Sequence, residues 1–314
     1  MPSQGADGLS VAIPTLNRGP YVADTAEALV DQAREDGISL DLLLLDQTRR
    51  HDSVSERRLS VLAESGVVRW SRLPEPNLVG AMNLGLRDAR EPIVLFLDDD
   101  IQPSPGLLSS HLAAHHEHQE AAVVGQILQP GEEPSAVVYE PQGGRLHRYM
   151  DFPFYSTRAR TIENVMAGNL SVKRAAAIAV GGFDENFTPP VASRFESEFA
   201  RRLIDSGHRI VFDPRPSIRH LAVSTGGTRS EGYFLRSAKP IFAVGDYYFA
   251  LRVGRDFERL RYMAKRPFRQ VATRFHLRNP WWILPKFIGE LRALFLALRL
   301  YRLGAKLAFP PAED

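Results

Sequence analysis

The sequence predicts an α/β fold: a doubly wound, mostly parallel sheet with helices on both faces, followed by a helical, basic C-terminal extension. Two observations predict it. Short apolar runs alternate with segments of helical periodicity through the first hundred residues, which is the pattern of βαβ units. Beyond residue 252 the chain becomes basic and mostly helical. We place the boundary at residue 232, so that residues 1–232 form the sheet domain and residues 233–314 the extension.

The alternating part supplies four strands and three helices. The expected strands are short and apolar: 9–16, 40–45, 67–70 and 93–97. The expected helices between them are 21–35, a helix around 59–63, and 78–89. Parallel strands joined by right-handed crossovers place ligands beyond the carboxyl ends of the strands. We therefore expect the functional residues at that edge of the sheet.

After residue 121 the alternation loosens. The expected strands there are 121–128, 165–172, 208–212 and 218–223, with a helix at 194–206. The stretch between the first two of these strands contains Gly and Pro and has hairpin character. Gly226 and Gly227 mark residues 224–232 as a mobile loop. In the extension, Pro285 begins a helix that reaches about residue 307.

Composition excludes several classes of protein. With 44% hydrophobic and 24% charged residues, the chain is globular rather than disordered. It has no cysteine, which excludes disulfides, thiolate zinc sites and cysteine nucleophiles and fits a reducing cytoplasm. Residues 1–8 lack the features of a secretory signal, and no apolar stretch approaches the roughly 18 residues of a spanning helix. We expect a cytoplasmic protein, soluble or peripheral at the inner face of the cell membrane.

Positive charge is concentrated in the extension. Residues 252–306 carry 14 Lys or Arg against 3 Asp or Glu, although the net charge of the chain is only +2. Such asymmetry suggests nucleic acid or anionic lipid as a partner. The helix that begins at Pro285 is apolar nearly all round, carries a basic stripe and follows Trp281 and Trp282, which favours an anionic membrane surface over nucleic acid. Packing on the sheet domain, or in a homodimer, is the alternative.

Three consecutive carboxylates, Asp98, Asp99 and Asp100, follow the strand at 93–97. Side chains alternate along an extended backbone, so Asp98 and Asp100 point to one side. Carboxylates gathered at a strand end repel one another and need a cation. Their oxygens suit magnesium or manganese, which also bind diphosphate. The alternative is an acidic turn with solvated side chains.

Polar residues and glycines occupy the neighbouring strand ends and a helix start. The first strand ends in the run 14–18, Pro-Thr-Leu-Asn-Arg, and the second at Asp46, where a nucleotide would bind in a doubly wound sheet. Asn77, Gly80 and Asn83 open the helix before the acidic strand. The glycine permits close backbone approach, and the asparagines offer hydrogen bonds to a base or ribose. An ordinary helix with packing glycines is the alternative.

Three more sequence motifs follow further along the chain, and together with the motifs above they occur in a fixed order. The members of this ordered set are the runs 13–18, 98–100, 167–171, 181–187 and 195–202, with Asp46, Asn77, Gly80, Asn83 and Gly85. This set resembles the family-2 inverting glycosyltransferases of the GT-A fold, over residues 10–220. Each piece is degenerate, but their order is specific. Leu16 and Gln47 depart from the pattern, which usually has an aromatic residue and an aspartate there.

The resemblance implies metal-dependent transfer of a sugar from a nucleotide diphosphate donor, most often a UDP-sugar, to a hydroxyl of a glycan or lipid-linked acceptor. The residues that it implies for donor binding are Pro14, Thr15, Asn17, Arg18, Asp46, Asn77, Gly80, Asn83, Asp98 and Asp99. Asp100, with His220, would hold a manganese or magnesium ion. Glu196 would be the general base, and residues 182–184 would border the acceptor site.

The chemistry of an inverting transfer supports a single base. The reaction is one in-line displacement, which needs a carboxylate to take the proton of the acceptor hydroxyl and a cation to stabilise the departing diphosphate. Glu196 is the candidate, with Glu198 as the alternate. Ser193-x-x-Glu196 is also a capping-box pattern, so that Glu196 could instead only cap a helix.

Histidines form a second cluster. His111, His115 and His118 fall at helical spacing with His116 beside them, a set that could bind zinc. No cysteine or positioned carboxylate completes it, so a solvated helix face is favoured.

Two other functions stay open. A nucleotidyltransferase would also use acidic metal ligands in a doubly wound sheet, but it normally has a Gly-rich phosphate loop where residues 14–17 stand. A catalytically inactive scaffold that binds nucleotide sugars is disfavoured by the intact acidic run 98–100 and by Glu196.

Overall fold

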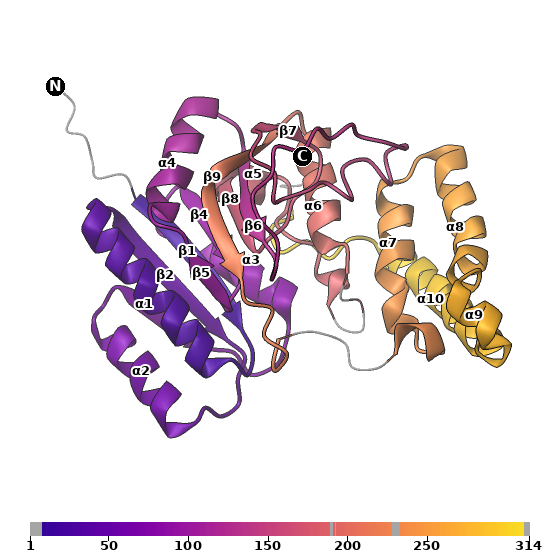
Figure 1. Ribbon diagram of the computed structural model, residues 1–314, viewed down its shortest axis with the longest axis horizontal. Coiled ribbons are helices and arrows are strands. Elements are labelled where there is room, and N and C mark those ends of the chain that lie inside the picture. Colours follow the sequence, from indigo (N-terminus) through magenta and orange to yellow (C-terminus); the bar gives the residue numbers. More distant parts are fainter. Residues whose placement is uncertain (1–7, 189–190, 192, 228–232, 311–314) are drawn as a thin grey trace.

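The computed structural model describes residues 8–188, 191, 193–227 and 233–310, and Figure 1 shows the sheet at its centre. Within these residues nine strands form one sheet in the order β3-β2-β1-β4-β8-β6-β9-β5, and β7 pairs with β9. The strands are β1 (Gly8–Thr15), β2 (Ser39–Asp46), β3 (Val68–Arg72), β4 (Ile93–Leu97), β5 (Ile101–Pro103), β6 (Ala122–Leu128), β7 (Arg160–Ile162), β8 (Asn169–Lys173) and β9 (Ile210–His220). β3, β2, β1 and β4 are parallel neighbours, whereas β8 is antiparallel to β4 and β6. The predicted mostly parallel, doubly wound sheet is confirmed.

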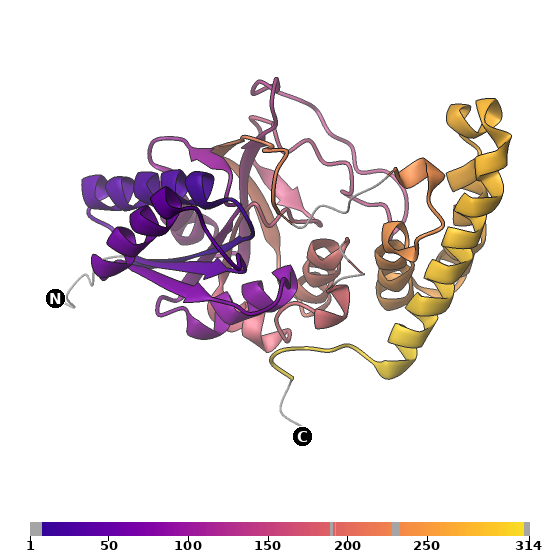
Figure 2. The same ribbon diagram turned by 90° about the horizontal axis from the view of Figure 1, so that it is seen from below.

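Helices cover both faces of this sheet (Figure 2). They are α1 (Gly19–Asp36), α2 (Ser53–Glu64), α3 (Leu78–Asp88), α4 (Leu107–His118), α5 (Arg174–Ala179) and α6 (Phe195–Asp205). α1 packs beside α2 and α4, whereas α3 packs beside α5 and against β1. The chain turns from β1 into α1 at Asn17, whose φ of 56° is left-handed, a conformation that asparagine tolerates. The turn keeps Thr15 and Arg18 together at the carboxyl end of β1.

The second half of the sheet differs from the expectation. The two strands expected at 208–212 and 218–223 form one strand, β9, which ends at His220. Its pairing with β6 shifts register opposite Val124 and Gln126, so the strand passes its two prolines in a bulge rather than ending there. The hairpin character expected between residues 128 and 165 is not seen: the isolated bridge between Ser135 and Ser156 is parallel, and β7 pairs with β9 instead.

The predicted helical extension is confirmed. It contains α7 (Val244–Val253), α8 (Asp256–Val271), α9 (Arg274–Arg278) and α10 (Ile283–Leu303), with α10 packed along α7 and α8. α10 ends at Leu303, four residues earlier than expected, and the chain then returns to the sheet part, where Leu307 bridges to Asp184. The boundary proposed at residue 232 lies outside the described residues, as do residues 228–232 of the expected loop. Among the helices that the structure describes, none is long and apolar enough to cross a membrane.

Candidate active site

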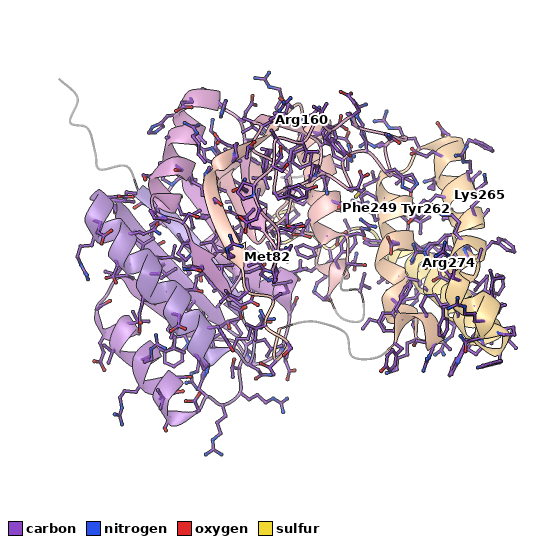
Figure 3. The ribbon with its side chains drawn as sticks, in the orientation of Figure 1. Met82, Arg160, Phe249, Tyr262, Lys265 and Arg274 are labelled. Atoms are coloured by element: carbon purple, nitrogen blue, oxygen red, sulfur yellow. The ribbon has the colours of Figure 1, made fainter. Side chains whose placement is uncertain are left out.

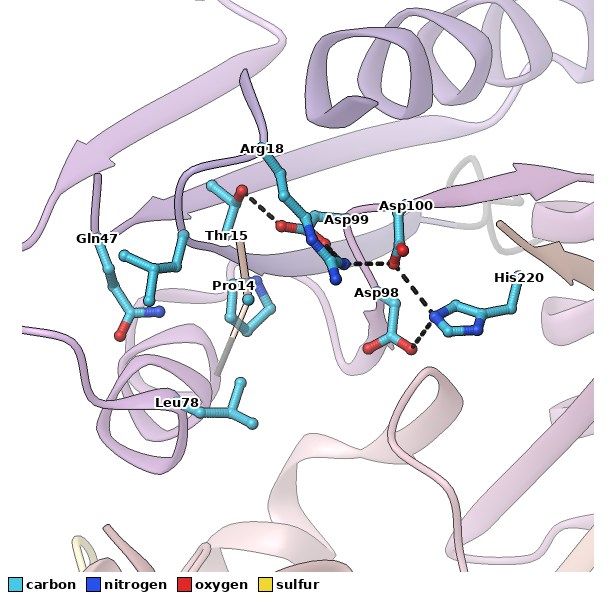
Figure 4. A pocket seen from close by; sticks show the side chains of 11 residues that line it. Pro14, Thr15, Arg18, Gln47, Leu78, Asp98, Asp99, Asp100 and His220 are labelled. Atoms are coloured by element: carbon cyan, nitrogen blue, oxygen red, sulfur yellow. Dashed lines mark hydrogen bonds and ion pairs between the residues drawn. The ribbon is translucent and has the colours of Figure 1, made fainter. Parts of the chain in front are cut away.

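The carboxyl ends of β1, β4 and β9 surround a cavity of about 200 Å³, here called the first cavity (Figure 4). β1 contributes Thr15 and, through the turn, Arg18. β4 leads directly into residues 98–100, and β9 ends at His220. The remaining lining residues are Pro14, Leu16, Gln47, Leu78 and Gly227. The sheet thus gathers polar residues that are far apart in the sequence at one edge, as expected for this topology.

Arg18 neutralises two buried carboxylates. Its Nη1 lies 2.8 Å from Asp99 Oδ1 and 2.6 Å from Asp100 Oδ1, and its guanidinium also donates to backbone carbonyls of residues 223–225. Thr15 donates to Asp99 Oδ2 over 2.6 Å. Burial raises the pKa of Asp99, and the hydrogen bonds and charge of Thr15 and Arg18 oppose that shift. These contacts hold the acidic run in one arrangement.

Asp98, Asp100 and His220 lie around one point of the first cavity (Figure 4). His220 Nε2 is 3.2 Å from Asp100 Oδ1 and 3.8 Å from Asp98 Oδ2. Its Nδ1 lies 2.9 Å from Gln129 Oε1. The Asp98 side chain is 53% exposed at the mouth of the cavity. Partial desolvation raises its pKa, the charge of His220 opposes this shift, and the charges of the two following aspartates reinforce it.

The chemistry of these three side chains fits a divalent cation. Asp100 Oδ1 is buried, has no hydrogen-bond partner of good geometry and lies within ion-pair distance of Arg18 and His220, so it is an oxygen surrounded by positive charge, as a cation's ligand is. Carboxylate oxygens and an imidazole nitrogen suit manganese. In the part of the chain that the structure describes, no three such side chains are already arranged as a complete metal site. A complete site would therefore need further ligands, such as the oxygens of a diphosphate.

At the end of β2 the structure brings Gln47, rather than Asp46, to the first cavity. Asp46 is fully buried, with its carboxylate 2.6 Å from His51 Nε2 and 2.8 Å from the indole nitrogen of Trp70. Gln47 lines the cavity, and its side-chain oxygen accepts from the backbone N–H of Asn77. The sequence interpretation missed Gln47. The alternation of side chains along a strand was the signal that could have found it, because adjacent residues face opposite sides.

The predicted donor-binding residues at the start of α3 also lie outside the first cavity. Asn77 caps α3 by accepting from the backbone N–H of Gly80 over 2.9 Å, and buried Asn83 exchanges hydrogen bonds of 2.9 and 2.8 Å with the backbone of Phe183. These three predicted residues line a separate groove of about 420 Å³. Asn17 is exposed in its turn and does not line the first cavity. With Asp46, five of the residues expected to bind the donor therefore do not line the first cavity.

Glu196 is the second residue of α6 and is largely buried. Its Oε1 accepts a hydrogen bond from the backbone N–H of Ala167. Burial raises the pKa of Glu196 to about 7; the Ala167 hydrogen bond opposes the shift, and the charge of Asp98 adds to it. A helix N-terminus lowers the pKa of a carboxyl, but here burial outweighs it. A carboxyl that titrates near neutrality suits general-base work.

The capping-box alternative disagrees with the structure. The N-cap of α6 is Arg194, in the left-handed conformation with φ 74°, and no side chain caps the helix. Glu198 is buried and accepts hydrogen bonds of 2.9 and 2.8 Å from Arg202. Because its carboxylate is committed to that ion pair, Glu196 is the better-placed base.

Two more cavities continue from the first. A middle cavity of about 190 Å³ shares Pro14, Leu78 and Asp98 with the first cavity. A third cavity of about 500 Å³ shares a different set with the middle one: Met166, Phe195 and Glu196. The third cavity is also lined by three residues of the extension: Ile241, Phe242 and Asp246. Glu196 therefore lies where the middle and third cavities meet.

The histidines of α4 belong to the core. Nε2 of His111 lies 2.8 Å from Asn169 Oδ1, and Nε2 of His115 lies 2.9 Å from Ser171 Oγ. Burial lowers the pKa of both. The expected solvated face is wrong for these two residues, because that side of α4 packs on β6 and β9.

Residues 182–184, expected beside an acceptor, line none of the three cavities. Buried Asp184 accepts from the hydroxyl of Tyr248 over 2.7 Å and from the backbone N–H of Lys306 over 2.9 Å. It thereby ties the end of the chain to the sheet part.

Comparisons with known proteins agree with this architecture. The family model described as Glycosyl transferase family 2 matches residues 10–178. Among solved structures, mannosyltransferase PcManGT from Pyrobaculum calidifontis, in complex with GDP-Man and Mn2+, is similar with a TM-score of 0.53 and 18% identity over 96% of this chain and 80% of that chain. GalNAc-T7 with UDP, GalNAc and Mn2+ is similar with a TM-score of 0.55 and 14% identity over 80% of this chain and 51% of that chain. No curated protein sequence matches.

Proposed function

Because the chain belongs to glycosyl transferase family 2, we propose that it moves a sugar, with inversion, from a nucleotide diphosphate donor to a hydroxyl of a glycan or lipid-linked acceptor. The observation that supports this proposal most is the series of three connected cavities, in which Glu196 lies where the middle and third cavities meet. The nucleotide diphosphate would lie in the first cavity, the sugar in the middle cavity and the acceptor in the third.

The chain's own residues would perform one displacement. Glu196, ionised above its pKa of about 7, takes the proton of the acceptor hydroxyl. The acceptor oxygen bonds to the anomeric carbon as the bond from that carbon to the diphosphate oxygen breaks. Attack from the side opposite the leaving group inverts the anomeric centre. Arg18 and the backbone around the first cavity hold the donor in line.

Asp98, Asp100 and His220 are the residues that would hold a manganese or magnesium ion, which when bound would neutralise charge on the departing diphosphate. Both similar solved structures contain Mn2+. They bind GDP-Man in one case and UDP with GalNAc in the other, and we take a UDP-sugar as the first donor to test.

A thermal-shift panel tests this proposal. Nucleotide sugars, free nucleotide diphosphates, nucleoside triphosphates and sugar phosphates are each added with and without Mn2+, because a ligand that binds the folded state raises the melting temperature by mass action. One nucleotide sugar should raise it, and only with the metal. A response limited to nucleoside triphosphate and sugar phosphate would instead indicate a nucleotidyltransferase. Binding without release of nucleotide diphosphate would indicate an inactive scaffold.

We also propose that the extension lies on an anionic membrane, at the cytoplasmic face. Bulky apolar residues are exposed along it. Those on α10 are Ile283, Leu284, Ile288, Leu291, Phe295, Tyr301 and Leu303, and Trp281 lies just before them. Exposed apolar patches of this kind mark an interaction surface, and basic residues beside them favour anionic lipid. A homodimer through the same face is the rival.

A further inference from the structure

A fourth cavity, here called the basic pocket, lies outside the three cavities of the proposed active site. It has a volume of about 480 Å³ between α8 and the turn at residues 143–147. Its basic lining residues are His147, Arg261, Lys265 and Arg269, and Glu258 is its acid. Figure 3 shows two of its lining residues, Tyr262 and Lys265, on α8.

The three basic residues of α8 form a row. Arg261, Lys265 and Arg269 are spaced four residues apart, and within the described chain none of them makes a hydrogen bond or an ion pair. By contrast, Arg266 of the same helix pairs with Asp246 and with Glu290 of α10, each at 3.1 Å. Like charges four residues apart on a helix destabilise it. Repulsion within the row therefore destabilises the ligand-free protein, and a bound anion would relieve that repulsion.

The wall opposite this row is held in place. Glu258 accepts from the backbone N–H of Leu146 over 3.0 Å, so the one acid among the described lining residues is engaged. The turn at Gly144 approaches the end of the Glu258 side chain closely, because a Cβ there would lie 2.3 Å from Glu258 Oε1. Arg145 Nε donates to the carbonyl of Val253 over 3.0 Å. The pocket is thus preformed.

His147 lies in a mostly positive electrostatic environment. Partial desolvation lowers the pKa of its exposed ring, and the charges of Arg269, Arg194 and Arg261 lower it further, with Glu258 alone opposing. The His147 ring lies beside Tyr262, with centroids 5.5 Å apart. Both the row and the opposite wall therefore experience a potential that attracts an anion.

An exposed apolar strip runs beside the basic row on the same helix. Phe257, Leu260 and Phe268 are 74%, 60% and 64% exposed. The Phe268 ring contacts Phe287 of α10, with centroids 5.8 Å apart, so the strip continues toward the apolar face of α10. A basic row beside an apolar strip fits a molecule with an anionic head and an apolar tail.

We propose that the basic pocket binds the phosphate or diphosphate group of a lipid-linked acceptor, whose saccharide enters the third cavity. This rests on the proposed function. The two cavities adjoin: the Tyr262 hydroxyl lies 3.5 Å from Asp246 Oδ1, and the backbone N–H of Met150 donates to the carbonyl of His147. Lys and Arg hold phosphate through charge-assisted hydrogen bonds. The lipid tail would leave along the strip of Phe257, Leu260 and Phe268.

Calorimetric titration tests the pocket with two probes, farnesyl diphosphate and inorganic diphosphate. Chelator is present throughout, so that no divalent ion can attach a diphosphate to the acidic run 98–100. The pocket variant combines Arg261→Gln, Lys265→Gln and Arg269→Gln. The control variant combines Arg255→Gln, Arg274→Gln and Arg278→Gln, which removes the same charge from exposed residues of the extension outside the pocket.

The pocket variant should lose affinity for farnesyl diphosphate by about 100-fold or more, and the control by less than about threefold. Farnesyl diphosphate should bind the wild type at least about tenfold more tightly than inorganic diphosphate. Equal affinities for the two probes would contradict a lipid-linked ligand and would indicate a site for free phosphate or diphosphate instead. No binding to the wild type, or equal losses in both variants, would overturn the site.

Donor binding in Mn2+ is measured on the same three proteins. If the wild type and the pocket variant bind a nucleotide sugar equally, a negative result with the diphosphates concerns the basic pocket alone. If the wild type binds no nucleotide sugar, the proposed function itself fails.

Discussion

Arg18 contributes stability by compensating two buried carboxylates. It is 6% exposed and contacts both Asp99 and Asp100. Removing one member of a buried ion pair costs about 3–5 kcal/mol, because the remaining charge is uncompensated. Arg18→Met should therefore lower the melting temperature by about 5 °C or more. Mn2+ should raise the melting temperature of the variant more than that of the wild type, because the ion replaces the lost charge. Equal shifts would show that the ion does not bind at these carboxylates.

The ionisation of Glu196 makes the stability of the folded protein depend on pH. Its pKa rises from the ordinary 4.5 to about 7 on folding. Between these values the folded protein holds a proton that the unfolded chain has lost, so stability falls as pH rises through this window, by up to about 3 kcal/mol. Glu196→Gln should therefore match the wild-type melting temperature near about pH 5 and exceed it near about pH 8. A variant that melts lower at the higher pH would mean that the carboxylate stabilises the fold.

For single residues, the sequence predicts which of them lie at the strand ends better than it predicts where their side chains point. Residues 98–100 follow a fully buried strand directly, so they lie at its end whatever their neighbours do. Asp46 and Gln47 differ by one position, and the pleat of β2 decides which faces the first cavity. The direction of Asn83 is set by Phe183, a hundred residues away, and no local pattern contains that contact.

α10 buries one charged pair, Lys286 and Glu290, and exposes bulky apolar residues beside its arginines. On its buried face, Lys286 Nζ lies 3.1 Å from Glu290 Oε1, and Glu290 Oε2 lies 3.1 Å from Arg266 Nε. Small residues on the same face, Ala293 and Ala297, are fully buried. Small buried residues allow close helix packing. The exposed face combines bulky apolar residues such as Leu291 and Phe295 with arginines, which is the combination found in helices that lie at a membrane interface.

Vesicle co-sedimentation tests that surface with a fold-preserving variant. Leu291→Asp with Phe295→Asp changes exposed positions only and should abolish binding to anionic vesicles. Val54→Asp with Val61→Asp, exposed positions of α2, is the matched control and should bind like the wild type. Salt should weaken wild-type binding without abolishing it, because apolar burial is not screened.

Two outcomes would contradict the membrane proposal. The wild type could stay in the supernatant at low salt, or lipid-free light scattering could show a dimer that the Leu291→Asp, Phe295→Asp variant dissociates. The second result would assign the face to a homodimer.

The elements of the first hundred residues are predictable because their strands are short, apolar and separated by helices. β9 is not, because its prolines resemble a strand end while pairing with β6 carries the strand past them. The covered face of α10 could not be predicted either. A helix that is apolar nearly all round has no sequence signal for the side that its neighbours choose.

Over the whole molecule, the sheet part and the extension share one proposed reaction path. The sheet part supplies the first and middle cavities, and the extension closes the third cavity with Ile241, Phe242 and Asp246. Among the described residues, only Glu196 and its neighbours Met166 and Phe195 line both the middle and third cavities. The account therefore places donor chemistry on one side of Glu196 and acceptor recognition on the other.

The most direct test is the rate at which Glu196→Gln releases nucleotide diphosphate from the donor that the thermal-shift panel identifies. The account predicts a rate lower by about 100-fold or more, with donor affinity within about threefold of the wild type, because the first cavity is unchanged. Glu198→Gln, which breaks the pair with Arg202, should melt at a lower temperature yet keep its rate per folded molecule. A Glu196→Gln enzyme with a near-normal rate, or a Glu198→Gln enzyme that folds and is inactive, would contradict the assignment of the base.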